Sequence, residues 1–233
     1  MPAPIGLQPT TDLAERVLLP GDPARALVLA EALLDGPKMF NHHRGLWGYT
    51  GLAPDGAPVT IQSTGMGGPS AAIVISELID LGARRLLRVG TCGALAVGPA
   101  LADLLVVTEA IAADGTSHAL GARERIPADP RLREALSGAG EHAGPVVSTD
   151  LFYDGRGLEH EWARAGAVAV EMEAATLFAL AALRDVQAAA LLVVSDLVLP
   201  PRRRIAPEEL RESEVRMGRA ALGALGLVPD RQA

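Results

Sequence analysis

Residues 64–95 constrain the fold most strongly, because a helix and a strand follow one another there between two glycine-rich stretches. The first stretch, residues 65–68, precedes Pro69, which is favourable in the first turn of a helix, and apolar residues then recur at roughly helical spacing. A strand is predicted at residues 84–89, and the glycines of residues 90–93 predict a sharp turn of the backbone where that strand ends. This succession is typical of an α/β sheet that binds a ligand at the carboxyl ends of its strands.

Short apolar segments alternate with helical patterns along the whole chain, which predicts an α/β fold with helices on both faces of the sheet. The predicted strands are residues 17–19, 59–64, 84–89, 104–108, 145–148, 167–170 and 188–194. The predicted helices are residues 24–34, 69–81, 131–139, 158–165, 172–183 and 207–225. Residues 112–129 and 197–206 are expected to be surface loops, because Gly, Pro and charged residues gather there.

With 233 residues the chain can bury about 70% of its unfolded surface, so we expect one domain over residues 1–233. The net charge of -7 argues against a nucleic-acid partner, so an anionic ligand would need locally placed arginines. Cys92 is the only cysteine, which excludes an internal disulfide and agrees with a cytoplasmic location. The sequence has neither a leader pattern nor a long apolar run, which predicts no signal peptide and no membrane partner.

An anion site is predicted where the strand at residues 84–89 ends. Arg88 and Thr91 would face a crevice together there, and an arginine fork beside free amides suits phosphate. Many α/β domains carry glycine turns and a strand-end arginine without binding anything, so the pattern alone leaves both interpretations open. The glycine spacing is not that of a dinucleotide site, and no Gly-Lys-Ser/Thr phosphate loop occurs.

Two further arginines are candidate phosphate contacts. Gly21 and Arg25 follow the predicted strand at residues 17–19, although Asp22 and Pro23 on their own favour an ordinary capped helix start. Arg44 lies on a polar turn, where a solvated arginine is the simpler interpretation.

Carboxylates at the ends of two other strands suggest the rest of a site. Glu171 and Glu173 flank Met172, and a carboxylate can accept hydrogen bonds from both hydroxyls of a ribose while a thioether packs on the sugar face. A single acid there would otherwise only complement the helix dipole. Asp196, next to Ser195, ends the apolar strand at residues 188–194, where burial favours the protonated carboxyl that a general acid needs.

Together these residues resemble the nucleoside phosphorylases of the trimeric to hexameric class, the bacterial purine nucleoside phosphorylase and uridine phosphorylase group. The matching motifs occur in the family's order between Glu15 and Asp196, with a weaker match in the final helix. They are LLPGDPARA, NHHRGLWGYTG, TGMGGPSAAI, LLRVGTCGAL, DLFY, VEMEAATLFALA and VVSD.

The resemblance implies a single-domain, three-layer α/β/α fold with a central mixed, partly barrel-like sheet. It also implies a homo-oligomer, at least a dimer and as a hexamer a trimer of dimers, with Arg44 donated to the neighbouring site. The implied roles are phosphate binding by Gly21, Arg25, Arg44, Arg88 and Thr91; ribose binding by Met172 and Glu173 with Glu171 beside them; base binding by Phe152, Cys92 and Gly93; and catalysis by Asp196 with Ser195. Cys92 itself is expected to be a small buried residue.

The activity implied is reversible phosphorolysis of purine ribonucleosides or deoxyribonucleosides to free base and pentose 1-phosphate. Inorganic phosphate is then a co-substrate, and no cofactor or metal is expected. Asp196 favours a purine, and the glutamine and arginine with which uridine phosphorylases grip uracil do not follow Phe152, whereas Thr91 slightly favours uridine. The alternatives are a uridine phosphorylase, a methylthioadenosine-type hydrolase and a non-catalytic nucleoside-binding protein.

The chain departs from the family pattern in two places. The family usually sends an N-terminal histidine to the ribose 5′-hydroxyl of the neighbouring subunit, but residues 4–6 contain none, so we expect 5′-deoxy or 5′-thio nucleosides to be tolerated. The purine enzymes also have a later arginine that pairs with the acid. The sequence leaves that role open among Arg202, Arg203, Arg204 and Arg211.

Overall fold

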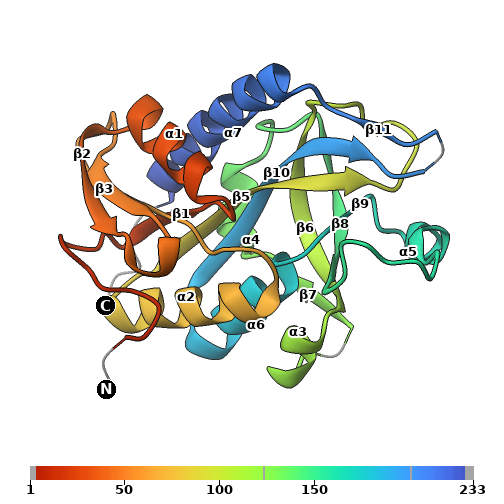
Figure 1. Cartoon of the computed structure of the whole chain (residues 1–233), viewed down its shortest axis with the longest axis horizontal. Coiled ribbons are helices and arrows are strands. Elements are labelled where there is room, and N and C mark those ends of the chain that lie inside the picture. The colour runs from red at the N-terminus through yellow and green to blue at the C-terminus, as the bar shows by residue number, and fades with distance from the viewer. Residues whose placement is uncertain (1–3, 123, 200, 229–233) are drawn as a thin grey trace.

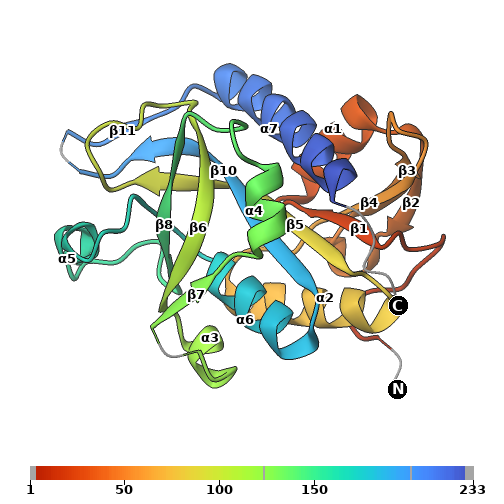
Figure 2. The same ribbon diagram turned by 180° about the vertical axis from the view of Figure 1, so that it is seen from behind.

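The computed structural model describes residues 4–122, 124–199 and 201–228. A mixed β-sheet lies between two layers of helices (Figure 1). Helices α1 (Pro23–Leu33) and α7 (Pro207–Leu227) pack together in one layer, and α2 (Gly68–Leu81) and α6 (Ala174–Arg184) pack together in the other. Seen from behind in Figure 2, α4 (Pro130–Ala135) lies over the strand β10 (Gln187–Leu197) and also contacts α7.

The remaining elements are short. The strands are β1 (Arg16–Leu19), β2 (Asp35–Asn41), β3 (Gly48–Leu52), β4 (Pro58–Gln62), β5 (Arg85–Ala94), β6 (Leu104–Ala113), β7 (Arg125–Pro127), β8 (His142–Thr149), β9 (Ala169–Glu171) and β11 (Arg203–Arg204). The other helices are α3 (Gly115–Ala119) and α5 (Glu159–Arg164), with a single 3-10 turn at His43–Gly45.

The sheet closes on itself at its centre. Its order is β11-β10-β6-β8-β9-β5-β1-β4-β3-β2, and β10 also pairs with β5, so that β10, β6, β8, β9 and β5 form a closed barrel. β10 runs parallel to β5 and antiparallel to β6, which makes the sheet mixed. The apolar sequence of β10 is explained by this position, since the strand is buried on both faces. The predicted three-layer α/β fold with a partly barrel-like sheet is confirmed.

Several local predictions are confirmed as well. Asp22 caps α1, since its carboxylate accepts a hydrogen bond from the Ala24 amide at 2.9 Å, and Pro23 is the first helical residue. The predicted end of the helix at residue 81 is confirmed, since Gly82 follows α2 in the left-handed conformation that glycine adopts without strain.

The sharp turn predicted at residues 90–93 is wrong. β5 continues through this stretch to Ala94 and stays paired with β10. The glycine at position 90 is explained by packing, because a Cβ atom there would lie only 2.8 Å from the Cζ of Arg88. The glycine therefore makes room for the Arg88 guanidinium beside the strand.

The two predicted loops also contain regular structure. Residues 112–129 include α3 and β7, and residues 197–206 include β11; residues 123 and 200 lie outside the described residues. β2 and β3 were not predicted either. Most of β2 is exposed and it contains glycine and proline, so it lacks the apolar alternation that indicates a strand. No helix among the described residues is long and apolar enough to cross a membrane.

Candidate active site

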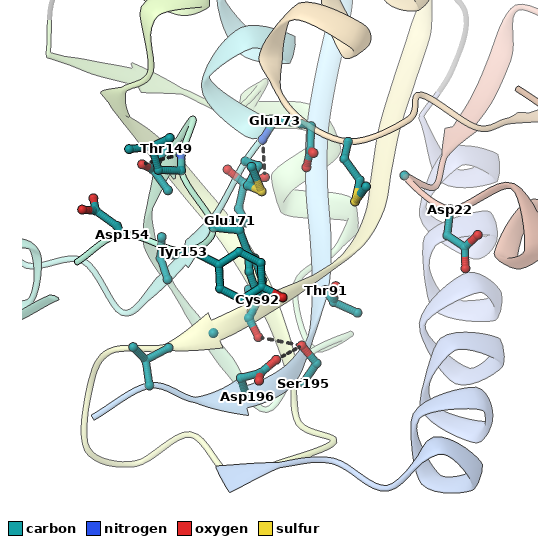
Figure 3. Close-up of a pocket in the computed structure, with 18 of the residues that line it drawn as sticks. Asp22, Thr91, Cys92, Thr149, Tyr153, Asp154, Glu171, Glu173, Ser195 and Asp196 are labelled. Carbon is teal, nitrogen blue, oxygen red and sulfur yellow. Dashed lines mark hydrogen bonds between the residues drawn. The ribbon is translucent and has the colours of Figure 1, made fainter. Parts of the chain in front are cut away.

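A cavity of about 710 Å³ opens at the carboxyl ends of the parallel strands β1, β5 and β10. Figure 3 shows Glu171 and Glu173 at one end of this site and Ser195 and Asp196 at the other. All the predicted site residues except Arg44 line the cavity. They are Gly21, Arg25, Arg88, Thr91, Cys92, Gly93, Phe152, Glu171, Met172, Glu173, Ser195 and Asp196.

Two buried arginines line the cavity. Arg25, in the first turn of α1, donates from Nε to the Glu214 carboxylate of α7 at 2.7 Å. Arg88, on β5, donates from Nε to Glu171 at 2.9 Å and from Nη2 to Glu173 at 2.5 Å. Three carboxylates thus surround two guanidiniums.

The charges within this cluster shift one another. Burial raises the pKa of the Glu173 carboxyl above its ordinary value, the charge of Arg88 opposes this rise, and the charge of Glu171 adds to it. Burial alone would lower the pKa of Arg88, but the charges of Glu173 and Glu171 outweigh it and raise that pKa instead. Arg88 therefore stays cationic, whereas Glu173 takes up a proton more readily than an ordinary carboxyl group does.

The two glutamates beside Met172 have different surroundings. Glu171 accepts hydrogen bonds from the amides of Glu173 and Ala174, in addition to those from Arg88 and the Ser148 hydroxyl. Its oxygens are therefore occupied in holding the start of α6 and the Arg88 side chain. Glu173 accepts only the Gly67 amide, at 2.5 Å, besides Arg88 among the described contacts, and it is the better placed of the two to receive sugar hydroxyls.

A β-bulge brings Ser195 and Asp196 to the same side of β10. Consecutive residues of a regular strand point to opposite faces, but the pairing of β10 with β5 shifts register between Val194 and Asp196. Both side chains consequently line the cavity, and the Ser195 hydroxyl donates to Asp196 Oδ2 at 2.9 Å (Figure 3).

Two of the four candidate arginines approach the Asp196 carboxylate. β11 pairs with the end of β10 so that Arg204 lies opposite Asp196, and its Nε is 3.7 Å from Asp196 Oδ1. Arg202 Nη2 lies 3.9 Å from the same oxygen. Both arginines are largely exposed, so solvent screens these interactions. The structure thus favours Arg204 and Arg202 as partners of the acid.

The cavity wall is partly aromatic. Phe152 packs edge-to-face on Tyr153 with 5.0 Å between the ring centroids, and half of Phe152 remains exposed at the cavity mouth. Burial raises the pKa of the Cys92 thiol, so this cysteine is a buried thiol in the wall and not a nucleophile.

Arg44 lies away from the cavity of its own chain. It is exposed in the 3-10 turn with φ of 56°, and its Nε donates to the Ile5 carbonyl at 3.2 Å. The segment that carries Ile5 is itself fixed, because the amides of Ile5, Gly6 and Leu7 all donate to the Glu77 carboxylate of α2. Arg44 and Ile5 thus form one anchored surface feature.

Some residues that shape the site were not predicted. Gly90 makes room for Arg88, Ser148 holds Glu171, the Gly67 amide holds Glu173, and Glu214 holds Arg25. The glycine beside Arg88 was visible in the sequence but was interpreted as a turn. The contacts of Ser148 and Glu214 depend on strand pairing and helix packing, for which the sequence gives no local signal.

Comparison with known proteins agrees with this geometry. Residues 15–225 match the Phosphorylase superfamily. A purine nucleoside phosphorylase of the DeoD type from Jannaschia sp. (strain CCS1) is 41% identical over 212 residues, covering 87% of this chain and 89% of that protein. One from Geobacillus kaustophilus (strain HTA426) is 39% identical over 209 residues, covering 85% and 88%. The crystal structure of uridine phosphorylase from Vibrio fischeri ES114, complexed with 6-hydroxy-1-naphthoic acid, superimposes with a TM-score of 0.83 at 26% identity and 92% coverage of both chains. The chain belongs to the Phosphorylase superfamily.

Proposed function

We propose that this protein is a purine nucleoside phosphorylase, which converts a purine nucleoside and inorganic phosphate into free base and pentose 1-phosphate. The observation that carries the proposal is the cavity itself, whose wall combines the guanidiniums of Arg25 and Arg88 with the carboxyl groups of Glu173 and Asp196. These groups suit a phosphate, a sugar diol and a leaving base. The names of the relatives from Jannaschia and Geobacillus support the purine substrate. The reaction needs no cofactor beyond phosphate as co-substrate.

Phosphate is held by Arg25, Arg88, Thr91 and the backbone at Gly21. The phosphate oxygen attacks the anomeric carbon as the glycosidic bond breaks, and the bonding electrons move onto the base. Glu173 orients the ribose through its hydroxyls and Met172 packs against the sugar, so the reactants are held in one geometry. The negative charge of the phosphate stabilises the cationic sugar that develops in the transition state.

Asp196 acts on the leaving base. Protonated Asp196 gives its proton to N7 of the purine, which neutralises the charge that arrives there, and such general acid assistance contributes about 10²–10⁴-fold. The Ser195 hydroxyl fixes the carboxyl through its hydrogen bond. Arg204 and Arg202 stabilise the carboxylate that remains after proton transfer.

The anion subsite requires a further cation. The two guanidiniums of Arg25 and Arg88 already pair with three carboxyl groups, so a dianionic phosphate meets no net positive charge from this cluster within one chain. Arg44 of a neighbouring subunit supplies the missing charge in our proposal, which makes the functional unit a dimer. The resemblance to the hexameric class of the family extends this proposal to a trimer of dimers.

Two observations bear on a second candidate. Thr91 and the likeness to the Vibrio fischeri uridine phosphorylase are compatible with uridine phosphorolysis. Asp196 weighs against it, because a uracil base has no N7 to protonate.

Product analysis of the purified protein tests the proposal. The protein is incubated with inosine, adenosine, guanosine and uridine, each with and without phosphate, and free base and pentose 1-phosphate are measured. We expect purine release that depends on phosphate. Release from uridine alone would indicate the pyrimidine enzyme, release without phosphate a hydrolase, and binding without turnover a nucleoside-binding protein.

A further inference from the structure

Glu214 is a buried carboxylate that lies outside the cavity and contacts a residue inside it. It sits on α7, in the helical layer behind the sheet, and only about a tenth of its side chain is exposed. Its Oε1 accepts the Arg25 Nε hydrogen bond at 2.7 Å, and Arg25 is as deeply buried as Glu214. The proposed mechanism assigns no role to this ion pair.

Close packing of α7 against α1 brings Glu214 next to Arg25. One turn beyond Glu214, Gly218 faces Leu29, which lies one turn beyond Arg25 on α1. A Cβ atom at position 218 would be 2.6 Å from Leu29 Cδ2 and 2.9 Å from Leu33 Cδ1. The missing side chain thus lets the two helices pack closely, and the same register sets Glu214 opposite Arg25.

Stability gives no sufficient reason for a buried pair at this position. Burying two charges has a desolvation cost that their attraction offsets only in good geometry, and apolar side chains of similar size often replace such pairs without loss. The surrounding contacts between α1 and α7 are apolar, so an apolar pair would suit the packing here. What the ion pair adds is orientation of the guanidinium.

The two cavity arginines are held in the same way. Arg88 gives its Nε to Glu171 at 2.9 Å, and Arg25 gives its Nε to Glu214 at 2.7 Å. Fixing Nε limits rotation of the planar guanidinium, and among the described residues no acceptor is recorded for either terminal amino group of Arg25, so both can serve another acceptor. Because Arg25 lines the cavity, that acceptor is the ligand.

We propose that Glu214 is a positioning residue for phosphate, which it affects through the orientation of Arg25. The inference rests on the proposed function for its ligand. It assigns a specific kinetic consequence, because loss of the Glu214 charge weakens phosphate binding and leaves nucleoside binding largely unchanged.

The test compares Glu214→Gln with the wild-type protein. Removing the negative charge of Glu214 would by itself favour an anionic ligand, so a rise in the KM for phosphate reports lost orientation of Arg25. We expect that rise to be on the order of 10- to 100-fold, because Arg25 loses its anchor and its preorganised position. The KM for inosine at saturating phosphate is expected to change little. The control is Arg216→Gln, on the same helix as Glu214, which removes the exposed ion pair that Arg216 forms with Glu141. It is expected to keep the wild-type phosphate KM. Equal KM values for phosphate in Glu214→Gln and wild type would overturn the proposal, as would an equal rise in the control.

A double-mutant cycle separates positioning from a general structural effect. If Glu214 acts through Arg25, Glu214→Gln adds no further rise in phosphate KM when Arg25 is already glutamine. Independent, additive effects would contradict the proposal. If Glu214→Gln does not fold, Glu214→Asp replaces it, because this variant keeps the charge but moves it by one methylene group. Glu214→Asp is expected to raise the KM for phosphate. A KM for phosphate equal to that of the wild-type protein would again overturn the proposal.

A binding measurement keeps this proposal separate from the proposed reaction. Phosphate alone raises the melting temperature of a protein that binds it in the folded state. We expect a smaller rise for Glu214→Gln than for wild type and the Arg216→Gln control. If the wild-type protein bound phosphate but cleaved no nucleoside, the proposed function would fail while this comparison still decided the role of Glu214. An equal rise in all three proteins would contradict that role.

Discussion

Arg88 and Glu171 lie on different strands, β5 and β9, and form a buried ion pair in which Arg88 Nε is 2.9 Å from Glu171 Oε2. The same carboxylate receives the amides of Glu173 and Ala174 at the start of α6. One side chain therefore fixes both the Arg88 guanidinium in the cavity and the backbone that carries Glu173.

This arrangement distinguishes the two glutamates experimentally. Glu171→Gln removes the partner of a buried cation and one acceptor of the helix start, so we expect it to lower the free energy of unfolding by about 3–5 kcal/mol. Glu173→Gln leaves Arg88 paired with Glu171, so it is expected to cost less stability and mainly to raise the KM for nucleoside. Urea unfolding and steady-state kinetics of both variants check this; similar stability losses in the two would contradict it.

The raised pKa of Glu173 predicts a pH dependence of stability. Because its pKa is higher in the folded protein than in the unfolded chain, the folded state holds a proton that the unfolded chain has already released. The stability that Glu173 contributes is therefore complete below the unfolded pKa of about 4.5 and is lost as the pH rises through the folded pKa. We expect the difference in unfolding free energy between wild type and Glu173→Gln to fall over that window. A difference that grows with pH would show that the shift has the opposite sign.

Substitution of the acid tests the chemistry at the base. Asp196→Asn keeps the size of the side chain but cannot give a proton, so kcat/KM for inosine is expected to fall by about 10²–10⁴-fold. A nucleoside whose N7 is already methylated, such as 7-methylguanosine, needs no proton there. For this substrate we expect Asp196→Asn to lower kcat/KM much less. Equal losses for both substrates would remove proton donation from the role of Asp196.

The sequence predicted this site to the extent that local patterns encode it. Arg88 lies near the end of one predicted strand and Asp196 follows another, and the carboxyl ends of parallel strands meet at one edge, so the convergence of these two residues could be foreseen. Glu173 reaches the site from β9, which runs antiparallel to β5, and this pairing could not be foreseen from the sequence. The bulge that turns Ser195 and Asp196 to one side depends on pairing with β5 and leaves no mark in the sequence. Glu214 reads as one more polar residue of a surface helix, because its partner Arg25 is 189 positions away.

The N-terminal segment predicts tolerance at the sugar 5′-position. Ile5 is 66% exposed, and it is tied to Arg44 through its carbonyl and to Glu77 through its amide, so a neighbouring site that receives Arg44 receives Ile5 beside it. An apolar side chain makes no hydrogen bond to a 5′-hydroxyl. We therefore expect kcat/KM for 5′-deoxyadenosine to lie within about tenfold of that for adenosine, since a site built to bind a hydroxyl rejects its absence far more strongly.

The variant Ile5→His provides the comparison. It introduces a group that can form a hydrogen bond with the 5′-hydroxyl. We expect it to raise the ratio of kcat/KM for adenosine to kcat/KM for 5′-deoxyadenosine. A large loss of activity without the hydroxyl in the wild-type protein would contradict the prediction.

Donation of Arg44 across an interface is tested by mixing two inactive variants. In a dimer of Arg44→Ala with Asp196→Asn, one site combines Asp196 of the first chain with Arg44 of the second and is complete, whereas the other site lacks both. Each variant alone has a defect in every site. After the two are unfolded and refolded together in equal amounts, about a quarter of the sites are expected to be complete, and phosphorolysis of inosine to recover in proportion. The control is a mixture of Asp196→Asn with Ser195→Ala. Both residues line the cavity of the same chain, so every site in this mixture keeps one of the two defects and no complete site can form. Activity of the first mixture no higher than the mean of its components would place Arg44 outside the neighbouring site.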